Sequence, residues 1–92
     1  MKLIIKPQFR HDRDRTNNVA LLEALADKLE QIENAKTVEN IIGIKPLKGY
    51  TTHYRIYVKT VRHSYRIGAI VRGNTIWLVR FLSRNKIYQR FP

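Results

Sequence analysis

The fold is decided by residues 54–88, YRIYVKTVRHSYRIGAIVRGNTIWLVRFLSRNKIY, which read as three short strands and a basic tail. Apolar and polar residues alternate from His53 onward, and this is the period of a strand. A second run, 64–71, is followed at 73–74 by Gly-Asn, a two-residue hairpin signal that leads into a third run, 75–82. This order predicts a three-stranded antiparallel meander.

The faces of these strands differ in composition. The third strand is apolar on both faces, so we expect it to lie inside the sheet. On the first strand of the meander, one face carries Tyr54, Ile56 and Val58. The opposite face carries Arg55, Tyr57 and Lys59. The second set is therefore predicted to stand on a different face from the apolar set.

The N-terminal half predicts helices beside one strand. Residues 2–6 form a short apolar run closed by a proline and read as a strand. Residues 9–18 are polar and mixed in sign, which leaves a short helix and a solvated connection both open. From 19 to 36, behind a cap at Asn17 or Asn18, apolar residues recur at helical spacing. We expect the core side of this helix to hold Leu22, Leu25 and Leu29.

The remaining segments complete the predicted layout. A brief turn over 38–40 and a connector over 41–49, interrupted by two glycines and a proline, lead into the meander. The tail, 83–92, has room for one helical turn. We expect an α+β domain of two layers, with the N-terminal strand and one or two helices packed on a small antiparallel sheet in the order β-α-α-β-β-β. At 92 residues, the chain 1–92 is a single domain.

Charge is distributed unevenly along the chain. The net charge is +11 and the pI is near 10.5, yet all seven acidic residues lie between Asp12 and Glu39. Residues 40–92 hold eleven Lys and Arg residues and no carboxylate. A surface so short of acid predicts salt-sensitive attraction to a polyanion. Our hypothesis is that the polyanion is RNA.

Several other classes of site are disfavoured. The chain has no cysteine, and His11, His53 and His63 lack the spacing of metal ligands, so we expect no metal site and no cofactor. Paired carboxylates, a nucleophile elbow and a glycine-rich phosphate loop are also missing from the sequence. No apolar run approaches the ~20 residues of a membrane span. We therefore expect a cytoplasmic protein that makes no membrane contact.

Arg55, Tyr57 and Lys59 form the first group of candidate RNA-binding residues. The cations can neutralise phosphates, and the tyrosine ring offers a surface on which a base can stack. A solvated strand face often has the same composition, so this alternative stays open. The absence of acid around the group favours the nucleic-acid interpretation.

Arg66 is the foremost single candidate. It lies in the middle of a predicted strand, where burial would leave its guanidinium in need of an acceptor. No carboxylate is near it in the sequence. The structural alternative is a pairing with a helix acid such as Glu23 or Glu39.

The tail contributes a second pair, Arg84 and Tyr88, which are four residues apart and share one face of any helix that forms there. Tyr88 can transfer a proton or stack on a base, and covering the sheet edge is an equally good interpretation of this tyrosine. The remaining cations that we expect to contact RNA are Lys48, Arg80 and Lys86.

The motifs resemble, as an ordered set, those of the RelE/ParE toxin superfamily. They are Leu47-Lys48-Gly49, Tyr54-Arg55-Ile56, Tyr65-Arg66-Ile67-Gly68 and Arg84-Asn85-Lys86-Ile87-Tyr88. The resemblance covers roughly 45–92, and the N-terminal half matches in arrangement only. The order of the predicted elements also agrees with the layout of that superfamily.

The resemblance implies the toxin of a type II toxin–antitoxin pair. It implies an endoribonuclease that cleaves mRNA, in association with the ribosome, and that uses the 2′-hydroxyl of the RNA to attack the neighbouring phosphate without a metal. Arg66 would stabilise the phosphorane, Arg84 would add charge, and Tyr88 would transfer a proton or stack. The implied partners are mRNA, the ribosome and a cognate antitoxin, expected to be acidic.

Two departures from the family pattern leave the proton acceptor open. Ser83 stands where relatives frequently have histidine, and Arg55 and Tyr57 stand where relatives carry two lysines. An arginine stays protonated and is a poor base. Two rival functions also remain, a ParE-like gyrase inhibitor that cuts nothing and a protein that binds RNA or the ribosome passively.

Overall fold

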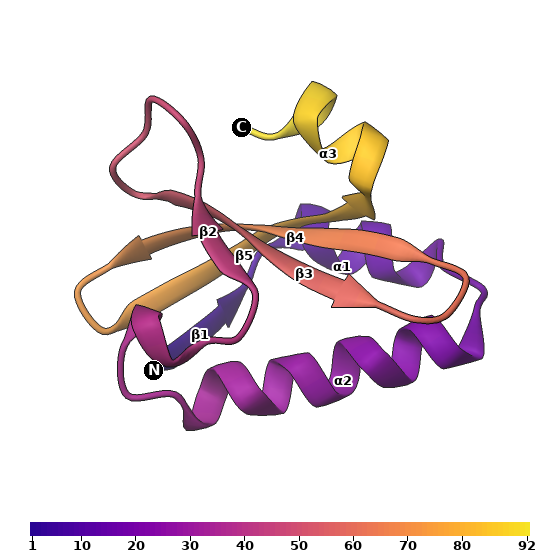
Figure 1. The fold of residues 1–92 in the computed structure, drawn as a ribbon, viewed down its shortest axis with the longest axis horizontal. Helices are drawn as coiled ribbons and strands as arrows, with labels where there is room; N and C mark the ends of the chain where they lie inside the picture. Colours follow the sequence, from indigo (N-terminus) through magenta and orange to yellow (C-terminus); the bar gives the residue numbers. More distant parts are fainter.

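A mixed sheet of five strands, in the order β1-β5-β4-β3-β2, carries the fold in the computed structural model, which describes all of residues 1–92 (Figure 1). The strands are β1 (Lys2–Ile5), β2 (Ile44–Pro46), β3 (His53–Lys59), β4 (Ser64–Arg72) and β5 (Thr75–Ser83). The helices are α1 (Pro7–Asp14), α2 (Val19–Asn34), the 3-10 turn η1 (Val38–Asn40) and α3 (Arg84–Arg90). The predicted α+β class is confirmed.

The meander of β3, β4 and β5 forms as the alternation predicted, with antiparallel pairing throughout. Its hairpin turn passes through Gly73, whose φ of +58° is one that glycine adopts without strain. The predicted central position of β5 is also confirmed, because β1 pairs with it in parallel on the side away from β4. The sheet is therefore mixed, whereas an antiparallel sheet was predicted.

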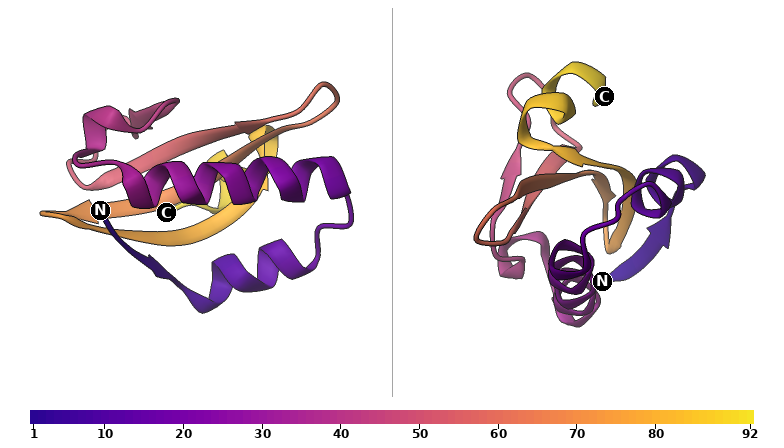
Figure 2. Two further views of the ribbon diagram at one scale, coloured as in Figure 1. Left: turned by 90° about the horizontal axis from the view of Figure 1, so that it is seen from below. Right: turned by 90° about the vertical axis from the view of Figure 1, so that its right-hand side faces the viewer.

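Helices cover both faces of the sheet. The two views of Figure 2 show α2 on one face of the sheet and α3 on the opposite face, with α1 beside β5. The main core lies between α2 and the sheet and is completed by Phe9 from α1. The prediction placed helices on one face only, so α3 is an addition to it.

The core side of α2 differs from the predicted one by one position at its start. Leu21, Leu25 and Ile32 are buried, whereas Leu22 is half-buried and lies outside the core cluster. Leu25 is confirmed, and Leu29 packs partly against the cluster. The helix begins after Asn18, whose side-chain oxygen accepts a hydrogen bond from the Leu21 amide at 2.8 Å. Successive residues of a helix are 100° apart, so Leu22 is turned away from the side on which Leu21 and Leu25 are buried.

Three segments gained more structure than was predicted. The segment left open at 9–18 contains α1, and the tail forms α3, which is about two turns long. The connector at 41–49 contains β2, which pairs with β3 at the edge of the sheet. Pro46 is tolerated there because an edge strand has a side that needs no amide donor.

The glycine before β2 explains how close this edge strand comes to its neighbour. Gly43 has a φ of +82°, and a Cβ placed on it would meet Cβ of Tyr57 at 3.2 Å. The chain entering β2 therefore lies directly against Tyr57. Separately, none of the helices has the length and apolar content that a membrane crossing would need.

Candidate active site

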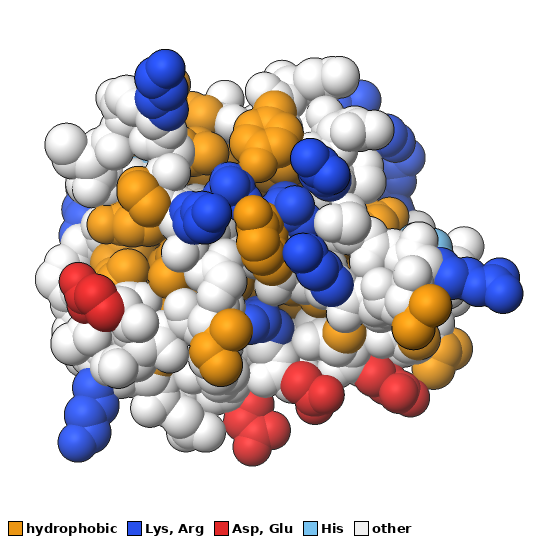
Figure 3. Space-filling model, in the orientation of Figure 1, with side chains coloured by type: hydrophobic (Ala, Val, Ile, Leu, Met, Phe, Trp, Pro, Cys, Tyr) orange, Lys and Arg blue, Asp and Glu red, His pale blue; other side chains and the backbone are white.

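Acidic and basic side chains occupy different parts of the molecule. In the space-filling view, most red side chains lie along α2, while blue side chains gather where β3 and α3 face the viewer (Figure 3). The only ion pairs are Arg13–Asp14 and Arg80–Asp12, both involving α1. The cations of β3, β4 and α3 thus have no carboxylate partner.

Tyr57 lies at the centre of this basic face, on the outer side of β3. The guanidinium carbon of Arg66, its cross-strand neighbour on β4, is 3.9 Å from the centroid of the tyrosine ring. Lys59 Nζ lies 4.6 Å from the same centroid, and the Arg55 guanidinium carbon lies 4.9 Å from it. Three cations therefore surround one ring, an arrangement that the ring quadrupole favours.

Arg66 is buried beneath that ring, with 4% of its surface exposed. Its Nη1 donates to Ser64 Oγ at 2.9 Å and to the carbonyl oxygen of Tyr65 at 3.0 Å. Its Nε has no partner, and neither has Nη1 of Arg55, although both atoms are buried. Buried donors are nearly always satisfied in folded proteins, so two unpartnered arginine nitrogens in one cluster mark a place where an anion would bind. The alternative pairing of Arg66 with Glu23 or Glu39 is not formed.

Helix α3 brings Tyr88 over the same strand. The Arg55 guanidinium carbon is 5.9 Å from the centroid of the Tyr88 ring, so Arg55 stands between two tyrosines. Tyr88 is 52% exposed and is available to a ligand. We name Arg55, Tyr57, Lys59, Arg66 and Tyr88 the basic cluster. Four of the five came from the strand motifs of the sequence, and Tyr88 came from the tail.

Arg84 opens α3 one turn before Tyr88 and is exposed without an ion-pair partner. The register explains its position, because Leu82 lies opposite Arg66 and α3 begins two residues later. The start of α3 therefore lies close along the chain to the residue opposite Arg66. The Arg84 guanidinium makes no ion pair or side-chain hydrogen bond within the protein.

A glycine and a phenylalanine anchor α3 on the sheet. The ring of Phe91, which is buried, lies so close to Gly68 that a Cβ on the glycine would come within 2.6 Å of it. Ile87 is also buried under the helix. The glycine of the Tyr65–Gly68 motif therefore makes the room that the helix carrying Tyr88 needs.

The charges around Tyr57 change its acidity. Donation from the Arg55 side chain toward the phenol, together with the positive charges of Arg55, Lys45 and Arg66, lowers the pKa of Tyr57 below the ordinary value for tyrosine. Partial desolvation acts in the opposite direction and is outweighed. Because a cation stabilises the phenolate more than the phenol, Tyr57 is more readily deprotonated than a tyrosine in water.

Lys45 is a further cation close to Tyr57, and it was not among the residues predicted from the sequence. It lies opposite Arg55 in the pairing of β2 with β3, and its charge acts on Tyr57. The alternating triplet at 44–46 was the available signal. The neighbouring glycine and proline concealed it, because they made the segment resemble a connector.

Three of the cations predicted to contact RNA lie outside the basic cluster. Lys48 is exposed in the turn between β2 and β3, and Lys86 is on another flank of α3. Arg80 is held elsewhere, since its Nε and Nη2 donate to the Asp12 carboxylate at 2.7 and 3.1 Å. The same carboxylate accepts from the Phe81 amide at 3.0 Å.

Asp12 and Arg80 are together because β5 is longer than its neighbour. The pairing of β1 with β5 ends at Leu78, so the Phe81 amide would lack a ladder partner. Helix α1 follows β1 and places Asp12 where the next strand residue would have been. Arg80 then neutralises the buried carboxylate, and this explains why the arginine does not join the basic cluster.

The chain was compared with known proteins. No profile of a protein family matches it. The toxin RelE3 of Methanocaldococcus jannaschii is 40% identical to it over 65 residues, which are 70% of this chain and 69% of that protein. A chain in the crystal structure of the RelB–RelE antitoxin–toxin complex from Methanococcus jannaschii superposes with a TM-score of 0.73 and 29% identity, covering 97% of this chain and 99% of the other.

Proposed function

This chain belongs to the RelE family of toxins, and we propose that it is the toxin of a type II toxin–antitoxin pair and cleaves mRNA as an endoribonuclease. The observation that carries the proposal is the pair of buried arginine nitrogens, Arg55 Nη1 and Arg66 Nε, that have no partner inside the protein. They belong to strands that carry no carboxylate, and they lie beside a tyrosine of lowered pKa. A phosphodiester supplies the acceptors that such a site lacks.

The reaction needs no nucleophile from the protein. The 2′-oxygen of the ribose loses its proton, forms a bond to the adjacent phosphorus, and the bond from phosphorus to the 5′-oxygen breaks. The products are a 2′,3′-cyclic phosphate and a 5′-hydroxyl, which takes up a proton. Arg66 and Arg84 supply positive charge to the phosphorane, with Arg55 beside them, and such stabilisation is commonly the largest catalytic contribution. The chain's own cations therefore take the role that a metal has in other nucleases.

Tyr57 is the proton acceptor in this proposal. Its lowered pKa raises the fraction of phenolate at a given pH, and general bases act best when their pKa approaches the working pH. Arginine cannot take this role, because it remains protonated. Tyr88, which faces Arg55 and is half exposed, then serves as the donor to the leaving 5′-oxygen or as a stacking surface for a base.

The partners follow from the same surface. The structural relative was crystallised as an antitoxin–toxin complex, and we propose that an acidic antitoxin covers the basic face of this chain, where charge complementarity would be greatest. The substrate is mRNA, reached on the ribosome in the cytoplasm. Lys59 of the basic cluster and Lys48 in the turn between β2 and β3 are both exposed, and in this proposal they add phosphate contacts.

The test is to map transcript ends after adding the purified protein to translated mRNA at low salt. We expect new ends that carry 2′,3′-cyclic phosphates, and we expect Arg66→Ala to reduce them by about a hundredfold or more. Arg72→Ala is the matched control, because Arg72 is an exposed arginine on the same strand outside the cluster. Folded wild-type protein that leaves translated mRNA intact would refute the proposal.

A further inference from the structure

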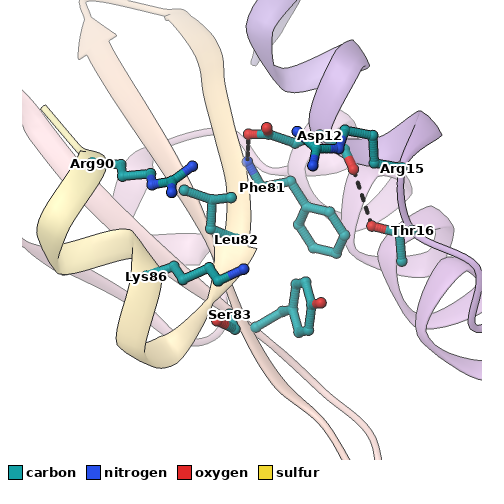
Figure 4. A pocket seen from close by; sticks show the side chains of 9 residues that line it. Asp12, Arg15, Thr16, Phe81, Leu82, Ser83, Lys86 and Arg90 are labelled. Carbon is teal, nitrogen blue, oxygen red and sulfur yellow. Dashed lines mark hydrogen bonds between the residues drawn. The ribbon is translucent and has the colours of Figure 1, made fainter.

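A cavity of about 160 Å³ lies between α1, the end of β5 and α3. It is separate from the basic cluster, and the side chains that concern us are Arg15, Thr16, Ser83, Lys86 and Arg90. We name it the α1–α3 cavity. Figure 4 shows Lys86 and Arg90 extending from α3 toward β5 and α1, across the space that the cavity occupies.

We infer that the α1–α3 cavity binds a second phosphodiester of the RNA strand that is cleaved in the basic cluster. This inference rests on the proposed function for the identity of the strand. A phosphate bound in the cavity would hold the RNA in place without contacting the reacting atoms.

The charge in the cavity is uncompensated. Arg15, the residue that follows α1, and Lys86 and Arg90 of α3 line it. All three are exposed, and none takes part in an ion pair or a side-chain hydrogen bond. The one carboxylate in the wall, Asp12, is already engaged by Arg80 and by the Phe81 amide. Cations that line one cavity repel one another, and an anion bound among them replaces that repulsion with attraction.

The donors and the size suit a phosphate group. Ser83 makes no side-chain hydrogen bond, not even as the cap of α3, so its hydroxyl is free to donate. Guanidinium, ammonium and hydroxyl donors are the groups that contact phosphate oxygens in protein–nucleic acid complexes. The volume of about 160 Å³ is sufficient for a phosphate group.

The position of the cavity connects it to the basic cluster. Arg84 and Tyr88 share one flank of α3, while Lys86 and Arg90 share another, about 200° around the helix axis. Ser83, which lines the cavity, is followed directly by Arg84, to which the proposed function assigns a contact with the scissile phosphate. A strand that crosses the N-terminal end of α3 therefore meets both sites. One RNA strand could place one phosphate in the basic cluster and another in the α1–α3 cavity.

The first experiment measures binding of an RNA made uncleavable by 2′-O-methyl groups. We expect Lys86→Gln/Arg90→Gln to weaken binding on the order of tenfold and to reduce the salt slope by about 0.7 for the lost contact to a single strand. Arg62→Gln/Arg72→Gln removes the same charge from exposed positions outside both sites and is expected to change binding far less. Far-UV circular dichroism and thermal melting establish that each variant is folded, and Ser83→Ala provides a milder probe.

The second experiment replaces one phosphate at a time with a neutral methylphosphonate. In the wild type, one position besides the scissile one should weaken binding, and this penalty should vanish in Lys86→Gln/Arg90→Gln but persist in Arg66→Ala. The inference is overturned if no position couples to the pair, if Arg62→Gln/Arg72→Gln behaves alike, or if the pair weakens binding to ribosomes or to an acidic antitoxin only. Because these readouts measure binding, a failure of cleavage alone counts against the proposed function and not against the cavity.

Discussion

Arg66 and Arg80 lie on neighbouring strands of the sheet, one buried and the other partly buried, and they differ in their partners. Arg80 on β5 is paired with the buried carboxylate of Asp12 through two hydrogen bonds. Arg66 on β4 has no carboxylate, donates to two neutral oxygens, and keeps one buried nitrogen unsatisfied. Burial alone therefore does not identify a cation with a structural role. What differs is whether the protein itself supplies the counter-charge.

The largest effect on stability is expected when the pair of Asp12 and Arg80 is broken. Asp12→Ala removes the acceptor of Arg80 and of the Phe81 amide, and breaking a buried pair in this way costs about 3–5 kcal/mol. Chemical denaturation measures this as a fall in the free energy of unfolding. Asp14→Ala is the control, because its pairing with Arg13 is long and exposed and should be worth ~0.5 kcal/mol or less. Equal losses in the two variants would contradict the structural role of Asp12.

Arg66→Ala should show the reverse pattern. We expect cleavage to fall by about a hundredfold to a thousandfold, as when one charge-stabilising donor is removed. Stability should change much less than in Asp12→Ala, because no carboxylate is left without its partner. Single-turnover cleavage and denaturation on the same preparation measure both. A variant that is strongly destabilised yet fully active would show that Arg66 is structural and that the contrast with Arg80 is false.

The pKa of Tyr57 reports on the cations around it that have no carboxylate partner. A lowered pKa means that the phenolate fraction, and with it the rate, rises about tenfold per pH unit and levels off below the pH at which an ordinary tyrosine would. Tyr57→Phe should lose about a hundredfold in rate and lose that rise. The pH profile with a no-protein control measures this. An unchanged profile in the variant would transfer the role to another group.

The smallest effect is expected at Gly68, where the ring of Phe91 holds α3 on the sheet. Gly68→Ala would drive a Cβ into the ring of Phe91, which should lower stability by about 1–3 kcal/mol and displace Arg84 and Tyr88. Because the clash is with one ring, Gly68→Ala/Phe91→Ala should be no less stable than Phe91→Ala alone. Thermal melting of the three variants measures this coupling, and additive losses would contradict it.

The candidate site was only partly predictable from the sequence. Alternation along β3 is a local signal, so the shared outer face of Arg55, Tyr57 and Lys59 was predicted and found. The contribution of Lys45 was missed, because a proline and a glycine hid a three-residue edge strand. Arg80 was grouped with the RNA contacts, because its partner Asp12 is 68 residues away in the chain.

By itself, the sequence determined the β3–β5 meander, the helix of α2 and the segregation of charge, because each depends on periodicity or composition within a short window. Only the tertiary structure decided which arginine meets a carboxylate, that Arg66 lies beneath Tyr57, and that α3 divides the basic cluster from the α1–α3 cavity. These features depend on which distant segments share an edge or a face. Strand lengths and helix packing set that choice, and a linear pattern does not contain it.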